Sequence, residues 1–538
     1  MNKLHAVLTL RDLVAFGVGG TVGAGIFVSI GVGATQSGPA LFLSFLLASV
    51  ACTISGLCFC EMASRVPVSG SSYSYTFAVL GEFPAFLIGS VLVLDSIIAA
   101  AACARAWSSY VVIVLPFVPS WLSTLSIPGL EHIFSLSLLS GFVCACLGLI
   151  LVFGIKETTM FNNLSTCLNI LVLSVFVFAG LPLADSANWT PFAPNGLEGI
   201  VRGAGRIFFA FLGFDVVNCL AEETQGNDAK RMVPKAILLT IGIATVVYVL
   251  VAVSFVGLAP IKDIALSSPL SSAFTLRGFP ALAYVVGVAA VGNTCTSILS
   301  NFLIQPRIVL RMAADGLLPS GLAHIDERGV PRYALLLSVS ASTATALLID
   351  FETLADMVSV ASLLSLSTVC VCSVIARLRP PTPRTQTEDD FEEAMQPLSP
   401  LSASPASLPS LSTFNKNLIG FLILCVCTAL SLLHEVPLWV SLTSLLLTAL
   451  TLGTTCFQHR KVCIPPTGVF QVPFSPAMPL LGVFVNTYLL LGLPTLALVR
   501  AAAVFASAGI YYWIKLARRP PVYPPEPIKV GAQKSIVE

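Results

Sequence analysis

Long runs without charged residues dominate the pattern of hydrophobic and polar positions. The first extends from Leu13 to Cys60 without an Asp, Glu, Lys or Arg, and similar runs recur along most of the chain. About 20 apolar residues in helical form cross a bilayer, so the pattern predicts an all-α integral membrane protein with about 14 transmembrane helices. We expect them near residues 12–35, 40–62, 83–112, 133–154, 160–181, 199–221, 234–257, 281–311, 333–350, 354–376, 417–434, 437–456, 477–498 and 500–516.

A glycine string interrupts the first of these segments, reading Gly20-Thr21-Val22-Gly23-Ala24-Gly25. Glycine is a poor residue inside a helix, because it leaves the backbone free and uncovered. At membrane depth, exposed backbone is tolerated only where it lines a cavity or is buried in protein. A second break is predicted in the sixth span, where Phe208 to Asp215 combines aromatic residues with Gly213.

The two breaks occupy matching positions in the chain. Each lies in the first span of a block of five, residues 13–181 and 199–376. An odd number of spans gives the blocks opposite orientations in the membrane. This pattern is typical of an inverted repeat with a ligand site near the bilayer midplane.

Two broken helices suit the two charged groups of an α-amino acid. Backbone N–H groups after Gly23 carry partial positive charge and favour a carboxylate, and carbonyls released before Gly213 favour an ammonium. The alternative is that the glycines only allow close helix packing. The predicted substrate-binding residues at the breaks are Thr21, Gly23, Ala24, Gly25, Ile26, Phe209, Ala210, Phe211 and Gly213.

Acidic residues near the breaks are further candidates for the site. Asp95 lies within the third span, where a carboxylate is costly, so it either serves the pathway by binding a cation or a proton, or makes a structural hydrogen bond. Arg105 lies ten residues further along and is too distant on one helix to pair with it. Asp215 either caps the helix after the second break or attracts a cationic side chain. Glu222 and Glu223 are predicted to form gate or interface salt bridges beside Lys230, Arg231 and Lys235.

Composition excludes several other classes of protein. Charged residues make up 10% of the chain and the net charge is +1, so no nucleic-acid partner is expected. The 15 Cys lie mostly within apolar segments and show neither a disulfide framework nor a zinc spacing. No phosphate-binding loop or catalytic motif is present, so neither an enzyme, a cofactor nor a metal site is predicted. The hydroxyls of Thr296 and Ser297 in the eighth span are expected to bond carbonyls of the preceding helical turn, and a sodium site is the alternative.

Basic residues predict the orientation in the bilayer. With the N-terminus in the cytoplasm, an even number of spans places the C-terminus there too. All of the 28 Lys and Arg then lie on the cytoplasmic side except Arg105, Arg202, Arg206, Lys262, Arg277 and Arg500. Asn188 begins the sequence Asn-Trp-Thr in a predicted extracellular loop and is a candidate for glycosylation, which Pro191 disfavours.

Residues 377–416 differ in composition from the rest of the chain, being rich in Pro, Ser, Thr and acidic residues. They are predicted to form a disordered cytoplasmic loop between a ten-helix core, residues 1–376, and four additional helices, residues 417–516. The predicted cytoplasmic tail, residues 517–538, contains Pro520-Pro521-Val522-Tyr523. This PPxY motif either binds the WW domain of a ubiquitin ligase or is only a proline-rich end to the helix.

Several motifs together resemble the amino acid–polyamine–organocation superfamily, and its cationic amino acid transporter branch in particular. They are Gly20 to Phe27, Gly56-Leu57-Cys58 with Glu61, Ser64 to Ser71, Ala104 to Ser108, Ala210 to Asp215, Glu222-Glu223, Val233-Pro234, Pro306-Arg307, Met312 to Leu318, Val472-Pro473-Phe474 with Pro479, and Asn486 to Leu489. The resemblance implies a leucine-transporter-type core of 5+5 helices with broken helices 1 and 6. Bacterial relatives pair an acidic residue at the position of Asp95 with a fifth-span lysine linked to proton coupling; this chain has Asn169 in that span.

The residues and the resemblance together predict a secondary carrier that moves amino acids by alternating access, with cationic ones such as arginine, lysine or ornithine as its expected substrates. Alternatives are a carrier of neutral amino acids or polyamines, a channel, and a sensor that binds an amino acid without moving it. The expected location is the plasma membrane, with a vacuolar or lysosomal membrane as the alternative.

Overall fold

The protein is described by a computed structural model. It describes residues 9–65, 71–126, 135–152, 159–214, 217, 229–266, 268–325, 331–378, 408–433, 436–462 and 470–516. The longer helices are α1 (Leu10–Thr21), α2 (Ala24–Ser37), α3 (Leu41–Arg65), α4 (Ser71–Leu80), α5 (Glu82–Val114), α6 (Leu138–Val152), α7 (Thr159–Gly180), α8 (Gly196–Ile207), α10 (Ala229–Leu258), α11 (Pro269–Leu276), α12 (Pro280–Ala314), α13 (Arg332–Leu348), α14 (Phe351–Ala376), α16 (Leu408–Leu433), α17 (Leu438–Val462), α18 (Ala477–Leu491) and α19 (Thr495–Tyr511).

Short elements join these helices. They are the 3₁₀ turns η1 (Gly38–Ala40), η2 (Ser120–Leu122), η3 (Leu181–Leu183), η4 (Ser186–Trp189), η5 (Phe208–Phe211), η7 (Ile261–Asp263) and η8 (Ser320–Ala323), the π turn η10 (Tyr512–Leu516), and the strands β1 (Leu125–Ser126) and β2 (Ser135–Leu136). The two strands pair antiparallel and form a two-stranded sheet. All other regular structure in the described residues is helical, as predicted for an all-α membrane protein.

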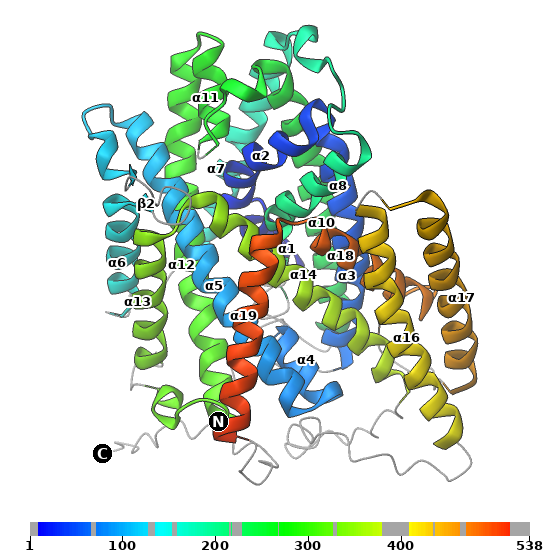
Figure 1. The fold of residues 1–538 in the computed structure, drawn as a ribbon. Helices are drawn as coiled ribbons and strands as arrows, with labels where there is room; N and C mark the ends of the chain where they lie inside the picture. Colours follow the sequence, from blue (N-terminus) through cyan, green and yellow to red (C-terminus); the bar gives the residue numbers. More distant parts are fainter. Residues whose placement is uncertain are drawn as a thin grey trace, which may run out of the picture.

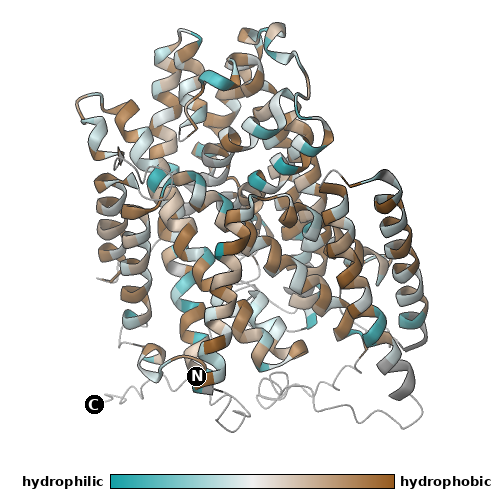
Figure 2. Cartoon of the chain, viewed as in Figure 1, coloured by the Kyte–Doolittle hydropathy of each residue, from teal (hydrophilic) through white to brown (hydrophobic). Residues whose placement is uncertain are grey.

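Ten helical stretches in the described part of the chain are long and apolar enough to cross a membrane. Three shorter apolar helices, α6, α13 and α18, accompany them. Hydrophobic residues run along most of the helices (Figure 2). Many large apolar side chains, among them Phe178, Val246 and Leu446, are exposed on the outside of the bundle. Such a surface is stable against lipid, because the helices satisfy their own backbone hydrogen bonds.

Long helix pairs build the interior of the bundle (Figure 1). Helix α12 packs along α5, and α10 packs along α3. Helix α1 contacts α7 and α10, while α2 contacts α8. Helices α16 and α17 pack on each other at one side of the molecule, and α18 joins them to α14. The breaks between α1 and α2 and after α8 therefore lie inside the bundle, surrounded by α5, α7, α10, α12 and α14.

Several predicted boundaries differ from the observed ones. Helix α16 begins at Leu408, so residues 408–416 are helical and do not belong to the predicted loop 377–416. Phe414 is fully buried in this extension and packs with residues of α14, which explains why it is helical. The predicted span 477–498 ends at Leu491, because Gly492 and Pro494 separate α18 from α19. Helices α4 and α11 were not predicted, since both are too short to give a membrane-spanning hydropathy signal.

Candidate functional site

The first glycine string forms the predicted break. Helix α1 ends at Thr21, where the Val22 N–H still donates to the Val18 carbonyl at 2.7 Å. Helix α2 begins at Ala24 with Gly23 as its N-cap, and no side chain caps this end. The N–H groups of the first turn of α2 have no partners within their own helix, so this end of α2 attracts negative charge.

The second break follows α8 and turns at a glycine. Helix α8 passes into η5, and the backbone turns at Leu212 and Gly213. Gly213 has a φ of +114°, a backbone conformation that residues other than glycine rarely adopt. A Cβ atom there would lie 2.4 Å from the carbonyl carbon of Gly20. Glycine is therefore required at position 213 both by conformation and by the close approach of α1.

The two breaks pack directly against each other. A Cβ atom added to Gly25 would lie 2.6 Å from the Cα atom of Ala210. The buried Tyr248 of α10 joins them further, because its hydroxyl lies 2.5 Å from the Thr21 carbonyl oxygen and 2.7 Å from that of Ala210. The sequence analysis did not identify Tyr248. The crossing of the breaks is thus held by backbone contact and by one shared hydroxyl donor.

A cavity of 130 Å³ lies at this crossing. Five of the predicted site residues line it: Thr21 and Gly25 at the first break, Phe209 and Gly213 at the second, and Asp95 on α5. The hydroxyl of Thr21 is buried and has no hydrogen-bond partner. Because buried polar groups normally have a partner, this hydroxyl is available to a ligand.

Asp95 is the one charged side chain that lines the cavity among the described residues. The Ser362 hydroxyl of α14 lies 3.4 Å from each of its carboxylate oxygens. The guanidinium of Arg105 does not contact Asp95; it donates to the carbonyls of Ala346 and Leu347 at 2.7 and 3.0 Å. The cavity therefore has a negative group on one wall and no cationic side chain among the described residues that line it.

A row of polar residues on α12 forms another wall of the cavity. It comprises Asn293, Thr296, Ser297, Ser300 and Asn301, and only Thr296 and Ser297 were singled out from the sequence. The five follow the spacing i, i+3, i+4, i+7 and i+8, which places them on one face of a helix. That spacing was present in the sequence and could have identified the row. The side-chain nitrogen of Asn293 is buried without a partner and is open to a ligand.

The other predicted site residues lie around the cavity without lining it. Gly23 is close to α12, because a Cβ atom there would lie 2.9 Å from the Ser297 hydroxyl. Phe211 is fully buried and packs edge-on against Tyr248, with ring centroids 5.1 Å apart. Ile26 is fully buried in the same hydrophobic core. Ala24 provides the first residue of α2, while Ala210 supplies a carbonyl that already accepts from Tyr248.

Asn169 of α7 contacts the first break directly. Its side-chain nitrogen donates to the carbonyl oxygen of Val22, and Asn169 is buried. Thr166, one turn earlier on α7, lines the cavity. The fifth-span residue that the sequence analysis compared with a lysine therefore binds backbone exposed by the break.

Some predicted positions lie outside the described residues: Asp215, Glu222, Glu223, and Pro520, Pro521 and Tyr523 of the tail motif. Asn188, the candidate glycosylation position, is described. Its side-chain nitrogen donates to the Gly257 carbonyl at 2.9 Å. This contact ties the loop after α7 to the end of α10.

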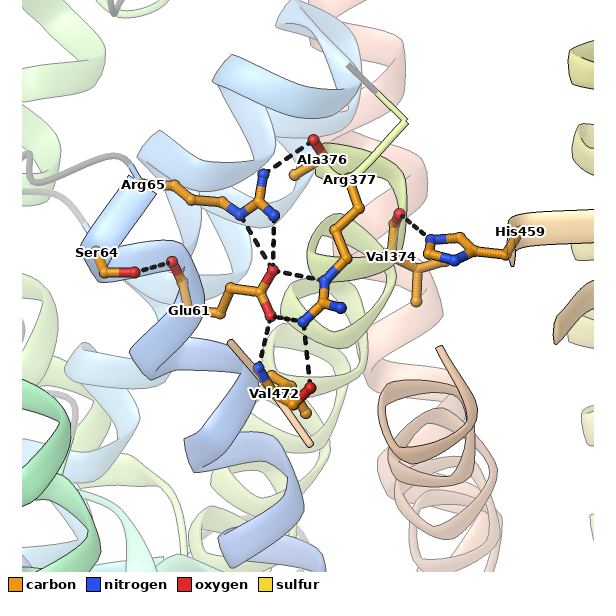
Figure 3. A network of polar contacts seen from close by, with 8 residues as sticks. All are labelled: Glu61, Ser64, Arg65, Val374, Ala376, Arg377, His459 and Val472. Atoms are coloured by element: carbon orange, nitrogen blue, oxygen red, sulfur yellow. Dashed lines mark hydrogen bonds and ion pairs between the residues drawn. The ribbon is translucent and has the colours of Figure 1, made fainter. Parts of the chain in front are cut away.

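A buried ion-pair network lies away from the cavity, where α3 and α14 end (Figure 3). The fully buried Glu61 accepts from Nε of Arg377 at 2.7 Å and from Nη2 of Arg65 at 2.9 Å. The backbone N–H of Val472, just before α18, also donates to Glu61 at 2.9 Å. The sequence identified Glu61 only as part of a family motif, so its role in joining three distant segments was missed.

A bundle of apolar helices with a polar cavity at two crossed helix breaks is the architecture of a membrane transporter. Comparison with known proteins agrees. The family model described as amino acid permease matches residues 8–433, and the model for the C-terminus of that permease matches residues 470–519. The chain belongs to the amino acid permease family and is a multi-pass membrane protein.

Similar curated proteins include several transporters. The chain is 32% identical to "Cationic amino acid transporter 4, vacuolar" of Arabidopsis thaliana, over 91% of this chain and 88% of the relative. It is 31% identical to "Cationic amino acid transporter 4" of Homo sapiens, over 93% and 85% of the two chains. It is also 33% identical to "Methylthioribose transporter" of Bacillus subtilis (strain 168), over 71% of this chain and 83% of the relative.

Proposed function

We propose that this amino acid transporter prefers cationic substrates and moves them by alternating access. The observation that carries the proposal is the position of Asp95, the one charged side chain among the described residues that line the cavity. A carboxylate within a membrane-spanning helix is costly, and a bound cation offsets that cost. The cationic amino acid transporters among the similar proteins support the same substrate class.

In this proposal the substrate backbone binds at the two breaks. Its carboxylate lies against the N–H groups of Ala24, Gly25 and Ile26 at the uncapped start of α2. Its ammonium lies toward the carbonyls of Phe209 and Ala210. The row of polar side chains on α12 then faces the substrate, and its cationic side chain extends toward Asp95.

The same proposal includes 14 spans, a 5+5 inverted repeat and cytoplasmic termini. The breaks after α1 and after α8 support the repeat, because they fall at the first span of each block. In Figure 1, α16 begins and α19 ends at the same end of the molecule. This arrangement is required if the segment before α16 and the tail after α19 are both cytoplasmic.

A carrier of uncharged polar substrates is the second candidate. The amides and hydroxyls of the α12 row favour it, since such groups can bind a neutral polar molecule without Asp95. The similarity to a methylthioribose transporter points the same way. The two candidates differ in the role they give to the Asp95 carboxylate.

Uptake into proteoliposomes tests the proposal. The parent protein and Asp95→Asn are compared with labelled arginine and a labelled neutral amino acid of similar length. We expect saturable arginine uptake that Asp95→Asn reduces by about tenfold or more, the value of a lost charge-assisted hydrogen bond, with a smaller effect on the neutral substrate. Glu198→Gln, at a surface ion pair of α8, is the matched control.

Equal losses for both substrates would assign Asp95 a structural role and favour the second candidate. Saturable binding of arginine without flux would identify a sensor in place of a carrier. Flux that does not saturate would indicate a channel.

A further inference from the structure

A crevice separate from the central cavity lies between α8 and the C-terminal helices. It has a volume of 390 Å³, and its walls come from α8, the end of α16 and the turn between α18 and α19. Leu430, Leu433 and Leu498 give it apolar surface. Arg202 and Arg206 give it cationic groups. The crevice therefore combines positive charge with hydrocarbon surface.

The two arginines lie one turn apart on α8, so they project from the same face of the helix. Arg202 pairs with Glu198 at the surface, where roughly half of each side chain is exposed. Nε of Arg206 lies 3.3 Å from Oδ1 of Asp356 on α14. A guanidinium has five N–H donors, so neither pair uses all of them. Both arginines keep donors for an anionic ligand.

A third arginine adds to the positive charge beside the crevice. Arg500 of α19 acts electrostatically on Asp356, and no described carboxylate forms an ion pair with it. Arg202, Arg206 and Arg500 are three of the six basic residues that the predicted topology places outside the cytoplasmic side. The predicted topology otherwise concentrates positive charge in cytoplasmic segments. Glu198 and Asp356 pair with two of these arginines, and a bound anion would give their remaining N–H donors a partner.

The apolar part of the crevice continues onto the outer surface of the bundle. Leu430 is exposed at its margin, and Leu496 and Val499 on α19 are exposed beside it. In a membrane protein these side chains contact lipid chains. A ligand with an anionic head and a hydrocarbon chain therefore matches the crevice better than a small water-soluble anion.

We propose that this crevice binds a membrane phospholipid. Its phosphate lies at Arg202 and Arg206, and an acyl chain covers Leu430, Leu433 and Leu498. Basic pockets between transmembrane helices are suited to lipid head groups. Helix α8 continues directly into η5, which carries Phe209 to the central cavity. A lipid in the crevice thus stabilises the half-helix that leads to the second break.

Native mass spectrometry of the full-length protein in detergent tests this site. The probes are phosphatidylglycerol, diacylglycerol with the same acyl chains, and inorganic phosphate. We expect the parent to retain phosphatidylglycerol in preference to diacylglycerol, and inorganic phosphate not to displace it. Arg202→Gln should reduce retention by about tenfold, as expected when a charge-assisted hydrogen bond is lost.

Two further variants make the experiment specific. Leu430→Trp fills the crevice and keeps both arginines, so it should also lower retention even if Arg202→Gln folds poorly. Arg277→Gln is the matched control: its guanidinium also pairs with a surface carboxylate, Asp185, at 3.8 Å, and it does not line the crevice. Equal retention by the parent and all variants would overturn the proposal. Equal retention of diacylglycerol, or displacement by inorganic phosphate, would overturn it as well.

Discussion

The hydroxyl of Tyr248 lies 2.7 Å from the carbonyl oxygen of Ala210. The Tyr248 hydroxyl also lies 2.5 Å from the carbonyl oxygen of Thr21, so α10 binds the backbone of both helix breaks. A hydroxyl has one hydrogen to donate, and the two carbonyls share it. Any movement of one break relative to the other must change this contact.

Tyr248→Phe should lower transport while leaving the fold intact. The ring still packs against Phe45 and Phe211, but the two carbonyls lose their common donor. A buried group left without its partner costs about 1–3 kcal/mol, so we expect a loss of about tenfold or more in uptake rate. Uptake by proteoliposomes measures it, with Tyr284→Phe on the exposed face of α12 as the control. Parent-like uptake by Tyr248→Phe would show that the shared hydroxyl is dispensable.

Gly25→Ala should abolish transport or folding at the crossing of the breaks. The added Cβ would lie 2.6 Å from the Cα atom of Ala210, and backbone cannot give way as a flexible side chain can. Gly242→Ala in α10 is the matched control, because a Cβ there meets nothing within 4 Å. Alanine favours helix over glycine by about 1 kcal/mol, so this control should be neutral or stabilising. Surface expression and uptake are measured together, and normal uptake by Gly25→Ala would contradict the observed crossing.

Glu61→Gln should destabilise the protein strongly. Glu61 is fully buried between Arg65 and Arg377, and its removal leaves two guanidinium groups without their carboxylate. Breaking a buried ion pair from one side costs about 3–5 kcal/mol. Glu198→Gln, which breaks an exposed pair with Arg202, should cost about 0–1 kcal/mol. Thermal unfolding in detergent compares the two variants, and similar shifts in both would refute a stabilising role for the buried network.

The environment of Asp315 predicts a dependence of stability on pH. Burial raises the pKa of Asp315, although Arg311 at 3.4 Å and the Tyr73 hydroxyl at 2.6 Å oppose this effect. Between the ordinary pKa and the raised one, the folded protein holds more protons than the unfolded chain. Its free energy of unfolding therefore falls as the pH rises through that window.

Asp315→Asn should remove this part of the pH dependence of the free energy of unfolding, because an amide does not titrate. The measurement is the midpoint of thermal unfolding at a series of pH values, for the parent and for the variant. Each unit of pKa shift corresponds to about 1.4 kcal/mol. Parallel curves for the two proteins would show that Asp315 does not contribute.

The sequence predicted those parts of the site that depend on local signals. Glycine lowers the stability of a helix where it is concentrated, so the breaks near Gly23 and Gly213 could be placed within a few residues. The α12 row from Asn293 to Asn301 also had a local signal in its helical spacing. Tyr248 had none, since its partner Thr21 lies 227 positions away and tyrosine is common in apolar helices. The same holds for Glu61 and Arg377, which are 316 positions apart.

The contact between Asn169 and Val22 bears on what drives the transporter. An amide neither gains nor loses a proton in the physiological range, so the donor that holds the backbone at the first break is present at every pH. The contact by which α7 binds the backbone of the first break is therefore the same whether or not a proton gradient is present. A proton that takes part in transport would have to act at a titratable group, and among the described residues that line the cavity this is the carboxylate of Asp95 or the thiol of Cys103.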